Sequence, residues 1–272
     1  MERWKKFEIK SSNYLNRFLD IDNVSTTNDG GGNSRETDVK LYYKSNLLFS
    51  IEVKLSPSQS GQFVVKFDNK RFFLSKENHN LNKYSLKVIE ILNRQGIDYK
   101  GENININCGD DLCFNWIKEH YTKKGVEFII TSNSIDSFYS IIPIDKINSF
   151  FEVSCVLRKK KSGTSDISIK DRLEVEKSVN EYLKSINNSV EKIDYDGKKM
   201  YLKSKKIINK SKLTVSESLF LSKQDENFRY RIKKRSSTNN PNVIFSLKYK
   251  GEKKDLGLTY LKEHIINNYL FE

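Results

Sequence analysis

The sequence predicts an α+β fold, in which a central mixed or antiparallel β-sheet is flanked by helices. Strand-like segments gather in runs and helical segments lie between the runs, whereas a regular βαβ fold would alternate single strands with helices. The chain has 272 residues, of which 37% are hydrophobic and 12% aromatic. This composition is sufficient for a packed core without covalent cross-links. We therefore expect a compact globular protein.

The N-terminal part of the chain is expected to form a helix, four strands and a second helix. Trp4, Phe7, Leu15 and Phe18 are spaced so that they can share one helical face. The polar stretch at 23–38 predicts a mobile loop, and its glycine run lacks the Gly-Lys-Ser/Thr of a phosphate-binding loop. In order, we expect a helix at 2–19, strands at 39–43, 48–55, 62–67 and 71–74, and a helix at 81–94 that ends near Gly96.

The C-terminal part continues the alternation of helices with groups of strands. Leu112, Trp116, Ile117 and Tyr121 recur at helical spacing and predict an amphipathic helix. In order, we expect a helix at 111–124, strands at 126–131, 138–142 and 151–157, a helix at 171–186, strands at 228–232 and 243–249, and a helix at 259–271.

The charge of the chain predicts a polyanionic partner. The formal net charge is +13 and the pI is near 9.4. Such an excess is typical of proteins that bind nucleic acid or an anionic membrane. No apolar run approaches the length of a bilayer span, and no apolar signal-peptide region follows the N-terminal charges. We therefore expect an intracellular protein that binds nucleic acid, with no membrane partner.

The three cysteines, Cys108, Cys113 and Cys155, cannot all pair with one another, which argues against a secreted disulfide framework. Cys108 and Cys113 have His120 nearby, but their spacing is not typical of a zinc site and no second Cys/His pair follows. We therefore expect buried, reduced thiols. The scattered histidines also leave little basis for a serine or cysteine catalytic triad.

The main candidate site lies on a strand with one polar face. In segment 48–55 the apolar residues alternate with polar ones, so Glu52 and Lys54 point the same way; the apolar set is Phe49, Ile51, Val53 and Leu55, and the polar set is Ser50, Glu52 and Lys54. The strand before it leaves Asp38 on the corresponding polar side. A hairpin that turns at residues 45–46 places Asp38 opposite residues 52–54. Two carboxylates and a lysine are therefore expected to meet on one patch.

This set of side chains suits metal-assisted hydrolysis of a phosphodiester. Two carboxylates a few ångströms apart repel each other unless positive charge lies between them, and hard oxygen ligands suit Mg²⁺. A lysine beside them can position and help to deprotonate the attacking water. Phosphodiester hydrolysis needs a Lewis acid, a hydroxide-like nucleophile and an in-line geometry.

An aspartate followed by Glu-x-Lys on adjacent strands resembles the motif of the PD-(D/E)XK nuclease superfamily, although Thr37 stands where that motif has proline. The segment at 114–133 and the later basic strands are similar in order to compact type II restriction endonucleases. The resemblance implies a PD-(D/E)XK nuclease core with Asp38, Glu52 and Lys54 as catalytic residues. It further implies that Asp38 and Glu52 bind Mg²⁺.

The resemblance also implies the partners and the biological setting. A type II restriction endonuclease makes Mg²⁺-dependent, site-specific double-strand breaks in DNA by phosphodiester hydrolysis. We accordingly expect double-stranded DNA as substrate, a homodimer on a palindromic site, a cognate DNA methyltransferase and the bacterial cytoplasm. We expect a catalytic half at 1–105 and a DNA-recognition half at 106–272, within one compact body.

Two basic segments, at 156–166 and 229–240, are the main candidates for DNA contact. Each ends a strand in a run of Lys and Arg followed by small hydroxyl residues, which suits phosphate binding, and arginine can also contact guanine edges. A polar turn after Lys54 can approach the DNA backbone. The run at 203–212 suits non-specific contact or simple exposure. The candidate DNA-binding residues are Ser58, Gln59, Ser60, Arg158, Lys159, Lys160, Lys161, Ser162, Arg229, Arg231, Lys233, Lys234 and Arg235.

Two other readings of the sequence remain open. One is a repair or junction-resolving nuclease of the same fold. The other is a non-catalytic nucleic-acid-binding protein, in which Glu52 and Lys54 form a surface ion pair. A DNA methyltransferase is disfavoured, because the NNPN at 239–242 lacks an aromatic residue after its proline and the chain has no glycine-rich cofactor loop.

Overall fold

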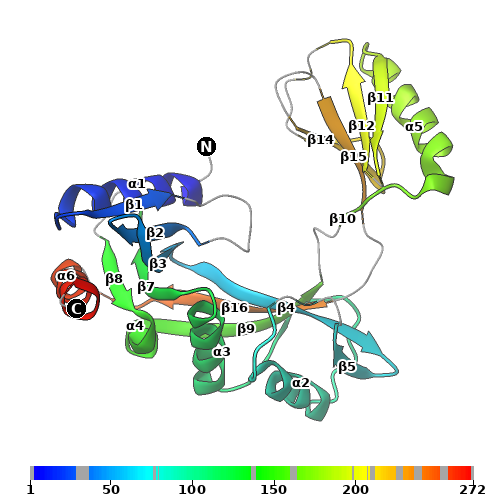
Figure 1. The fold of residues 1–272 in the computed structure, drawn as a ribbon. Helices are drawn as coiled ribbons and strands as arrows, with labels where there is room; N and C mark the ends of the chain where they lie inside the picture. The colour runs from blue at the N-terminus through cyan, green and yellow to red at the C-terminus, as the bar shows by residue number, and fades with distance from the viewer. Residues whose placement is uncertain are drawn as a thin grey trace. The chain divides into compact units, whose positions relative to one another are not determined.

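The computed structural model describes residues 3–28, 37–75, 78, 80–135, 139–159, 164–197, 199–206, 208, 212–224, 229–235, 241–251 and 257–270. The chain forms two compact units (Figure 1). Unit 1 comprises Met1–Lys159 and Asn240–Glu272, and unit 2 comprises Lys160–Asn239. These units do not coincide with the expected boundary near residue 105, because the C-terminal segment returns to the sheets of unit 1. The assignment of catalysis to residues 1–105 and of DNA recognition to residues 106–272 stays a prediction.

The first sheet of unit 1 is mixed, which confirms the predicted α+β class. The predicted hairpin is present, and its turn lies at Lys44 and Ser45, whose φ angles are 46° and 71°. β3 pairs in parallel with β7, whereas the other neighbours in this sheet are antiparallel. The strand order is β1 (Val24–Asn28), β2 (Val39–Tyr43), β3 (Asn46–Leu55), β7 (Val126–Ser132) and β8 (Ser140–Pro143). β1 lies in the stretch expected to be a loop, since its threonines and serine pair with β2 at the sheet edge.

Two helices contribute to the core on one face of this sheet. Phe7 and Leu15 of α1 (Arg3–Phe18) are fully buried there, and so are Leu261 and Ile265 of α6 (Leu258–Ile265). Trp4 and Phe18, which were expected on the same apolar face as Phe7 and Leu15, are both 43% exposed. α6 is followed by a π-helical turn, Ile266–Leu270, so the predicted C-terminal helix changes its winding midway.

The second sheet of unit 1 is antiparallel throughout. Its strand order is β5 (Arg71–Leu74), β4 (Ser58–Asp68), β16 (Pro241–Tyr249), β9 (Phe151–Lys159) and β6 (Ile104–Asn105). β16 pairs with β9 from Tyr249 opposite Phe151 to Pro241 opposite Lys159. β4 begins at Ser58, so most of the segment predicted as a polar turn after Lys54 is strand, because its backbone pairs with β16. A short helical segment joins β8 to β9, η1 (Ile144–Lys146) and α4 (Ile147–Phe150).

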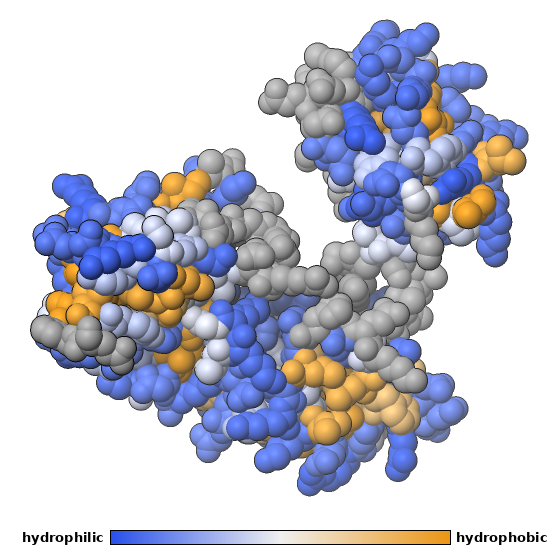
Figure 2. Space-filling model, in the orientation of Figure 1, coloured by the Kyte–Doolittle hydropathy of each residue, from blue (hydrophilic) through white to orange (hydrophobic). Residues whose placement is uncertain are grey.

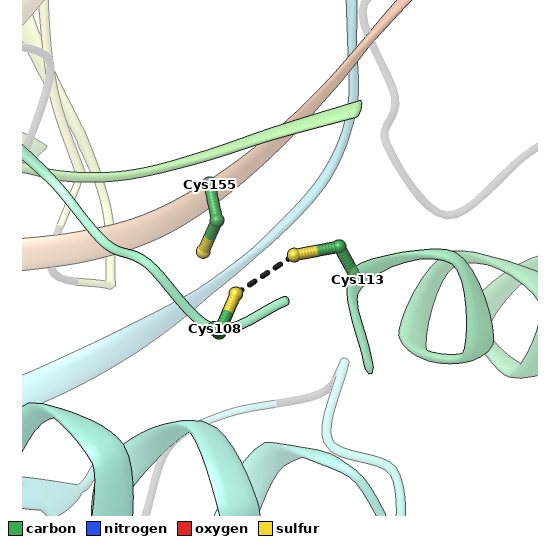
Figure 3. Close-up of side chains that lie close together, drawn as sticks. All are labelled: Cys108, Cys113 and Cys155. Atoms are coloured by element: carbon green, nitrogen blue, oxygen red, sulfur yellow. Dashed lines mark hydrogen bonds between the residues drawn. The ribbon is translucent and has the colours of Figure 1, made fainter. Parts of the chain in front are cut away.

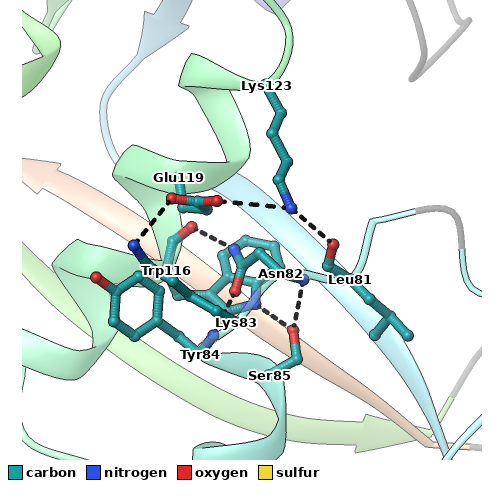
Figure 4. Close-up of polar contacts among 8 residues, drawn as sticks. All are labelled: Leu81, Asn82, Lys83, Tyr84, Ser85, Trp116, Glu119 and Lys123. Atoms are coloured by element: carbon teal, nitrogen blue, oxygen red, sulfur yellow. Dashed lines mark hydrogen bonds and ion pairs between the residues drawn. The ribbon is translucent and has the colours of Figure 1, made fainter.

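α2 (Ser85–Arg94) and α3 (Asp110–Thr122) belong to the core of this second sheet, and a polar network joins them (Figure 4). The Asn82 amide donates to the Trp116 carbonyl at 2.9 Å, and the Trp116 indole donates to Ser85 Oγ at 2.9 Å. The backbone N–H of Tyr84 donates to Asn82 Oδ1 at 3.0 Å. These local bonds hold residues 81–84 as a turn, so α2 begins at Ser85, four residues later than predicted.

The described residues of unit 2 form an antiparallel sheet and a long helix that is preceded by a short 3-10 turn. Its strand order is β11 (Val190–Asp196), β12 (Lys199–Ser204), β15 (Arg229–Arg235), β14 (Leu219–Lys223) and β13 (Lys212–Thr214), and β10 (Thr164–Ser165) also pairs with β15. The helix α5 (Arg172–Ser185), preceded by η2 (Ile169–Asp171), buries Val175, Val179 and Leu183 in the core with residues of β12, β14 and β15. Of these strands the sequence predicted only β15.

The surface of both units is largely hydrophilic on the face shown in Figure 2, with hydrophobic residues confined to smaller patches. Within the described ranges, no helix combines the length and the apolar character that crossing a bilayer requires.

Candidate active site

Asp38, Glu52 and Lys54 come together at the start of β2 and on the adjoining part of β3. Lys54 Nζ lies 2.6 Å from Glu52 Oε1 and 3.6 Å from Asp38 Oδ2. The backbone N–H of Val53 donates to Asp38 Oδ2 at 2.8 Å, which fixes the aspartate across the hairpin. Thr37 Oγ1 donates to Ser50 Oγ at 3.0 Å and ties the same two strands together. The structure therefore brings together the three residues that the sequence singled out.

The polar face of β3 is buried, whereas a solvated strand face would be open. Glu52 is 7% exposed, and the side chains of Lys54 and Asp38 are 17% and 13% exposed. Pairing with β2 and β7 covers only the edges of β3, and the electrostatic interaction of Lys54 with the buried Tyr121 indicates that α3 covers this face. Buried charges are retained only when they are paired or hold a ligand, so this cluster is more than a surface ion pair.

Burial and mutual attraction determine the protonation of the cluster. Burial raises the pKa of Asp38, an effect that the Lys54 ammonium group opposes and the Glu52 carboxylate reinforces. Burial alone would lower the pKa of Lys54, but the Glu52 and Asp38 carboxylates raise it above its ordinary value. Lys54 therefore stays charged at neutral pH and acts as a donor.

The carboxylates fit a hard divalent cation. Glu52 Oε2 is buried and has no hydrogen-bond partner among the residues that the structure describes. An orphaned buried carboxylate oxygen loses its hydration without compensation, which is costly unless a cation or ordered water completes its shell. Asp38 pairs with the same ammonium group as Glu52. Glu52 and Asp38 thus offer oxygen ligands of the kind that Mg²⁺ prefers.

Glu8 of α1 is a further member of the site that the sequence analysis missed. It is 9% exposed and follows the buried Phe7. Its pKa is raised to about 7, first by burial and then by the nearby Asp38 carboxylate, with Lys54 opposing and Glu52 adding to the effect. An acidic residue beside the apolar stripe of α1 was the available signal in the sequence. Glu8 can exchange a proton near neutral pH.

The candidate DNA-binding residues of unit 1 occupy two strands. Ser58 and Gln59 begin β4 and are partly or fully exposed, whereas Ser60 is 2% exposed. Arg158 and Lys159 are exposed at the end of β9. Lys160, Lys161 and Ser162, together with the glycine run at 29–33, lie outside the described residues.

In unit 2, β15 presents a row of cations on one face of the sheet. Tyr230 and Ile232 point into the core, so the alternating residues face the other way. Arg231 Nη2 lies 2.5 Å from Asp166 Oδ1, and Lys234 Nζ lies 3.7 Å from Asp171 Oδ2. The cations on the outward side are Arg229, Arg231, Lys233 and Arg235.

The neighbouring strand β12 extends this row, which the sequence analysis did not anticipate. Tyr201 is paired in register with Arg231, and Lys203 with Arg229. The guanidinium group of Arg229 stacks over the Tyr201 ring at 4.1 Å. We call this surface the basic sheet face, and it consists of Lys199, Tyr201, Lys203, Arg229, Arg231 and Lys233. The alternation Lys-x-Tyr-x-Lys in β12 is the sequence pattern that would have indicated a strand with one basic face.

A solved structure of HhaI endonuclease in complex with DNA is similar to this chain. The two share 27% sequence identity and a TM-score of 0.71, over 98% of this chain and 98% of the other. The likeness therefore extends over the sheets of unit 1 and the inserted unit 2 alike. No protein-family model matches the sequence, and no curated protein matches it.

Proposed function

We propose that the protein is a Mg²⁺-dependent type II restriction endonuclease with a PD-(D/E)XK core, which makes site-specific double-strand breaks in DNA. The observation that carries this proposal is the buried cluster of Asp38, Glu52 and Lys54, in which one glutamate oxygen lacks a partner among the described residues. The likeness to an endonuclease in complex with DNA, over nearly the whole of both chains, supports it.

The residues of the cluster divide the chemistry among them. When bound, Mg²⁺ supplies positive charge that polarises the scissile phosphate and activates the attacking water. Asp38 and Glu52 hold the ion through their carboxylate oxygens. Lys54 donates hydrogen bonds that orient the water and balance charge on the phosphate, since its raised pKa prevents it from accepting a proton.

DNA binding is assigned to the basic sheet face of unit 2 and to the exposed cations Arg158 and Lys159 of unit 1. The net charge of +13 supports a polyanionic substrate. Lysines contact phosphates as point charges, whereas the planar guanidinium of arginine can bind a guanine edge through two hydrogen bonds. Sequence specificity is therefore expected to depend on arginines.

The biological setting follows from the same proposal. Cutting both strands of a palindromic site with one cluster per chain is most simply done by two chains, whose two-fold symmetry matches that of the DNA. A restriction enzyme acts in the bacterial cytoplasm and is paired with a DNA methyltransferase that protects the host sequence. A methyltransferase gene beside the gene of this protein is the corresponding genomic observation.

The proposal is tested by cleavage of plasmid DNA with Mg²⁺ and with a chelator. We expect discrete fragments only with Mg²⁺, and no cleavage by Asp38→Asn or Glu52→Gln. Both variants should still bind DNA, because removing a carboxylate near phosphates relieves repulsion. Glu90→Gln, which changes an exposed carboxylate of α2 paired with Arg94, is the matched control and should cut normally.

Two results would exclude the assignment. If folded Asp38→Asn and Glu52→Gln variants cut at the wild-type rate, the cluster is not the active site. If the wild-type protein binds DNA but never cuts it in Mg²⁺, the protein is a non-catalytic DNA-binding protein.

A further inference from the structure

All three cysteines of the chain converge at one point in unit 1, although Cys155 is distant in sequence from Cys108 and Cys113. Cys108 precedes α3, Cys113 lies in the first turns of α3, and Cys155 lies on β9. Their sulfur atoms all lie within 4.8 Å of one another, and each residue is buried (Figure 3). The sequence has three cysteines in total, so no thiol is left outside this cluster.

We propose that Cys108, Cys113 and Cys155 bind one Zn²⁺ ion per chain, as a structural site that fastens the N-terminal end of α3 to β9. Thiolates are the ligands that Zn²⁺ favours in structural sites. This site is separate from the carboxylate cluster of β2 and β3, whose hard oxygen ligands suit Mg²⁺ instead. The proposal does not rest on nuclease activity.

The spacing of the sulfur atoms is compatible with a tetrahedral ion. Zn–S bonds are about 2.3 Å, so two sulfurs on one tetrahedral ion lie about 3.8 Å apart. Cys108 Sγ and Cys113 Sγ are 2.7 Å apart, and no pair in the cluster exceeds 4.8 Å. The required spacing falls between these two values. The side chains project toward a common point in Figure 3, and rotation about their Cα–Cβ bonds changes the spacing of the sulfur atoms.

A cavity beside the sulfurs provides for the fourth ligand. It has a volume of about 230 Å³, and its lining includes all three cysteines together with Asn107, Asp110 and Ser154. A water molecule, or the carboxylate of Asp110 at the start of α3, can complete four-coordination from this side. His120 is not part of the cluster, which among the described residues comprises the three cysteines alone, and its ring instead stacks on Trp116 at a centroid distance of 5.1 Å.

Zn²⁺ binds the thiolate form of cysteine, so the protons that the three thiols carry leave when the ion binds, and no electrons are transferred.

The ion would add to the backbone contacts between these segments. The backbone N–H of Ile106 donates to the Cys155 carbonyl at 2.8 Å, and the two-residue β6 is the remaining strand contact of this loop with β9. Gly109, which precedes α3, has a φ of 75°, so the chain turns sharply between Cys108 and the helix. A metal bond on each side of this turn fixes the start of α3 against the sheet.

The full-length protein is the material for the test. It is reduced, stripped of metal with a chelator and titrated with Co²⁺, whose thiolate-to-metal charge-transfer absorption reports sulfur ligands. Zn²⁺ is then titrated against a chromophoric chelator across a range of pH. We expect one ion per chain, loss of reaction of all three thiols with a thiol reagent, and an affinity that rises with pH near neutrality, since thiol protons leave when the ion binds.

Variants distinguish metal binding by the three cysteines from metal binding by other side chains. Cys155→Ser should weaken Zn²⁺ binding by about a hundredfold or more, because structural sites use every thiolate. Glu52→Gln and Asp111→Asn, the latter an exposed acid of α3, are controls that should leave the cobalt absorption unchanged.

Three results would overturn the proposal. They are the absence of charge-transfer absorption in the folded wild-type protein, a Cys155→Ser variant with wild-type affinity, and recovery of a Cys108–Cys113 disulfide in place of metal uptake. The wild-type measurements decide the matter by themselves if a cysteine variant fails to fold.

Discussion

Replacing Glu8 by glutamine should stabilise the protein at alkaline pH and leave its stability unchanged in acid. The pKa of Glu8 is raised from an ordinary value of 4.5 to about 7, mainly by burial. Below the lower value the carboxyl group is protonated in both the folded and the unfolded chain. Between the two values only the unfolded chain ionises, so the free energy of unfolding falls as pH rises. Above about pH 7 the folded protein carries the full free-energy cost of the buried, ionised Glu8 carboxylate, and Glu8→Gln removes that cost.

The size of the effect follows from the change in pKa. Each pKa unit corresponds to about 1.4 kcal/mol, so a rise from 4.5 to about 7 amounts to about 3 kcal/mol. Solvent still reaches part of the carboxyl group and screens it, and we therefore expect a gain of about 1–2 kcal/mol in the variant.

Urea denaturation in the presence of a chelator, at about pH 5 and about pH 8.5, measures this gain. The exposed α2 variant Glu90→Gln is the control and should show no gain that grows with pH. The difference in free energy of unfolding between Glu8→Gln and the wild type could turn out to be the same at both pH values. In that case Glu8 would not be ionising against the carboxylates of the site. The assignment of Glu8 to the active site would then fail.

Lys54→Ala should lower the cleavage rate by roughly 10²- to 10⁴-fold while DNA affinity persists, as single-turnover kinetics and a binding assay can show. Arg231→Ala should reduce the preference for cognate over random DNA more than Lys233→Ala does, and equal losses on both DNAs would contradict base contact by Arg231. DNA affinity should fall steeply with salt, with a slope of about −0.9 per phosphate contact on logarithmic axes, whereas a flat titration would exclude DNA as partner. Gly61→Ala should lower the free energy of unfolding by about 1–3 kcal/mol in a thermal or urea unfolding assay, because an added Cβ would lie 2.4 Å from Trp116. Unchanged stability would show that the Trp116 ring moves aside freely.

The candidate active site could be predicted from the sequence because its signal is local. Alternation with period two fixes which side chains of one strand share a face, and a short turn fixes the partner strand. Asp38, Glu52 and Lys54 lie within one hairpin, so both rules apply to them. Neither rule predicts the position of Glu8, because its place beside the cluster depends on how α1 packs on the sheet.

The parts of the fold that were missed depend on distant contacts or on polar strands. β11 and β12 contain more lysine and acidic residues than a typical strand, and their pairing is stabilised by a single buried face against α5. The meeting of Cys155 with Cys108 and Cys113 requires the docking of β9 beside α3, which no spacing rule along the chain predicts. The unit boundary likewise depends on β16 pairing with β9 across the whole of unit 2.

That last pairing has a consequence for the order of folding. β9 and β16 are hydrogen-bonded neighbours, yet all of unit 2 lies between them in the sequence. Closing an unstructured loop costs more conformational entropy as it lengthens, by about 0.6 kcal/mol for each doubling. Unit 2 leaves the ribosome before β16 does, and once folded it replaces a long flexible loop by a short, rigid one. Destabilising unit 2 should therefore slow the assembly of the β9–β16–β4 sheet during refolding, although no residue of that sheet has been changed.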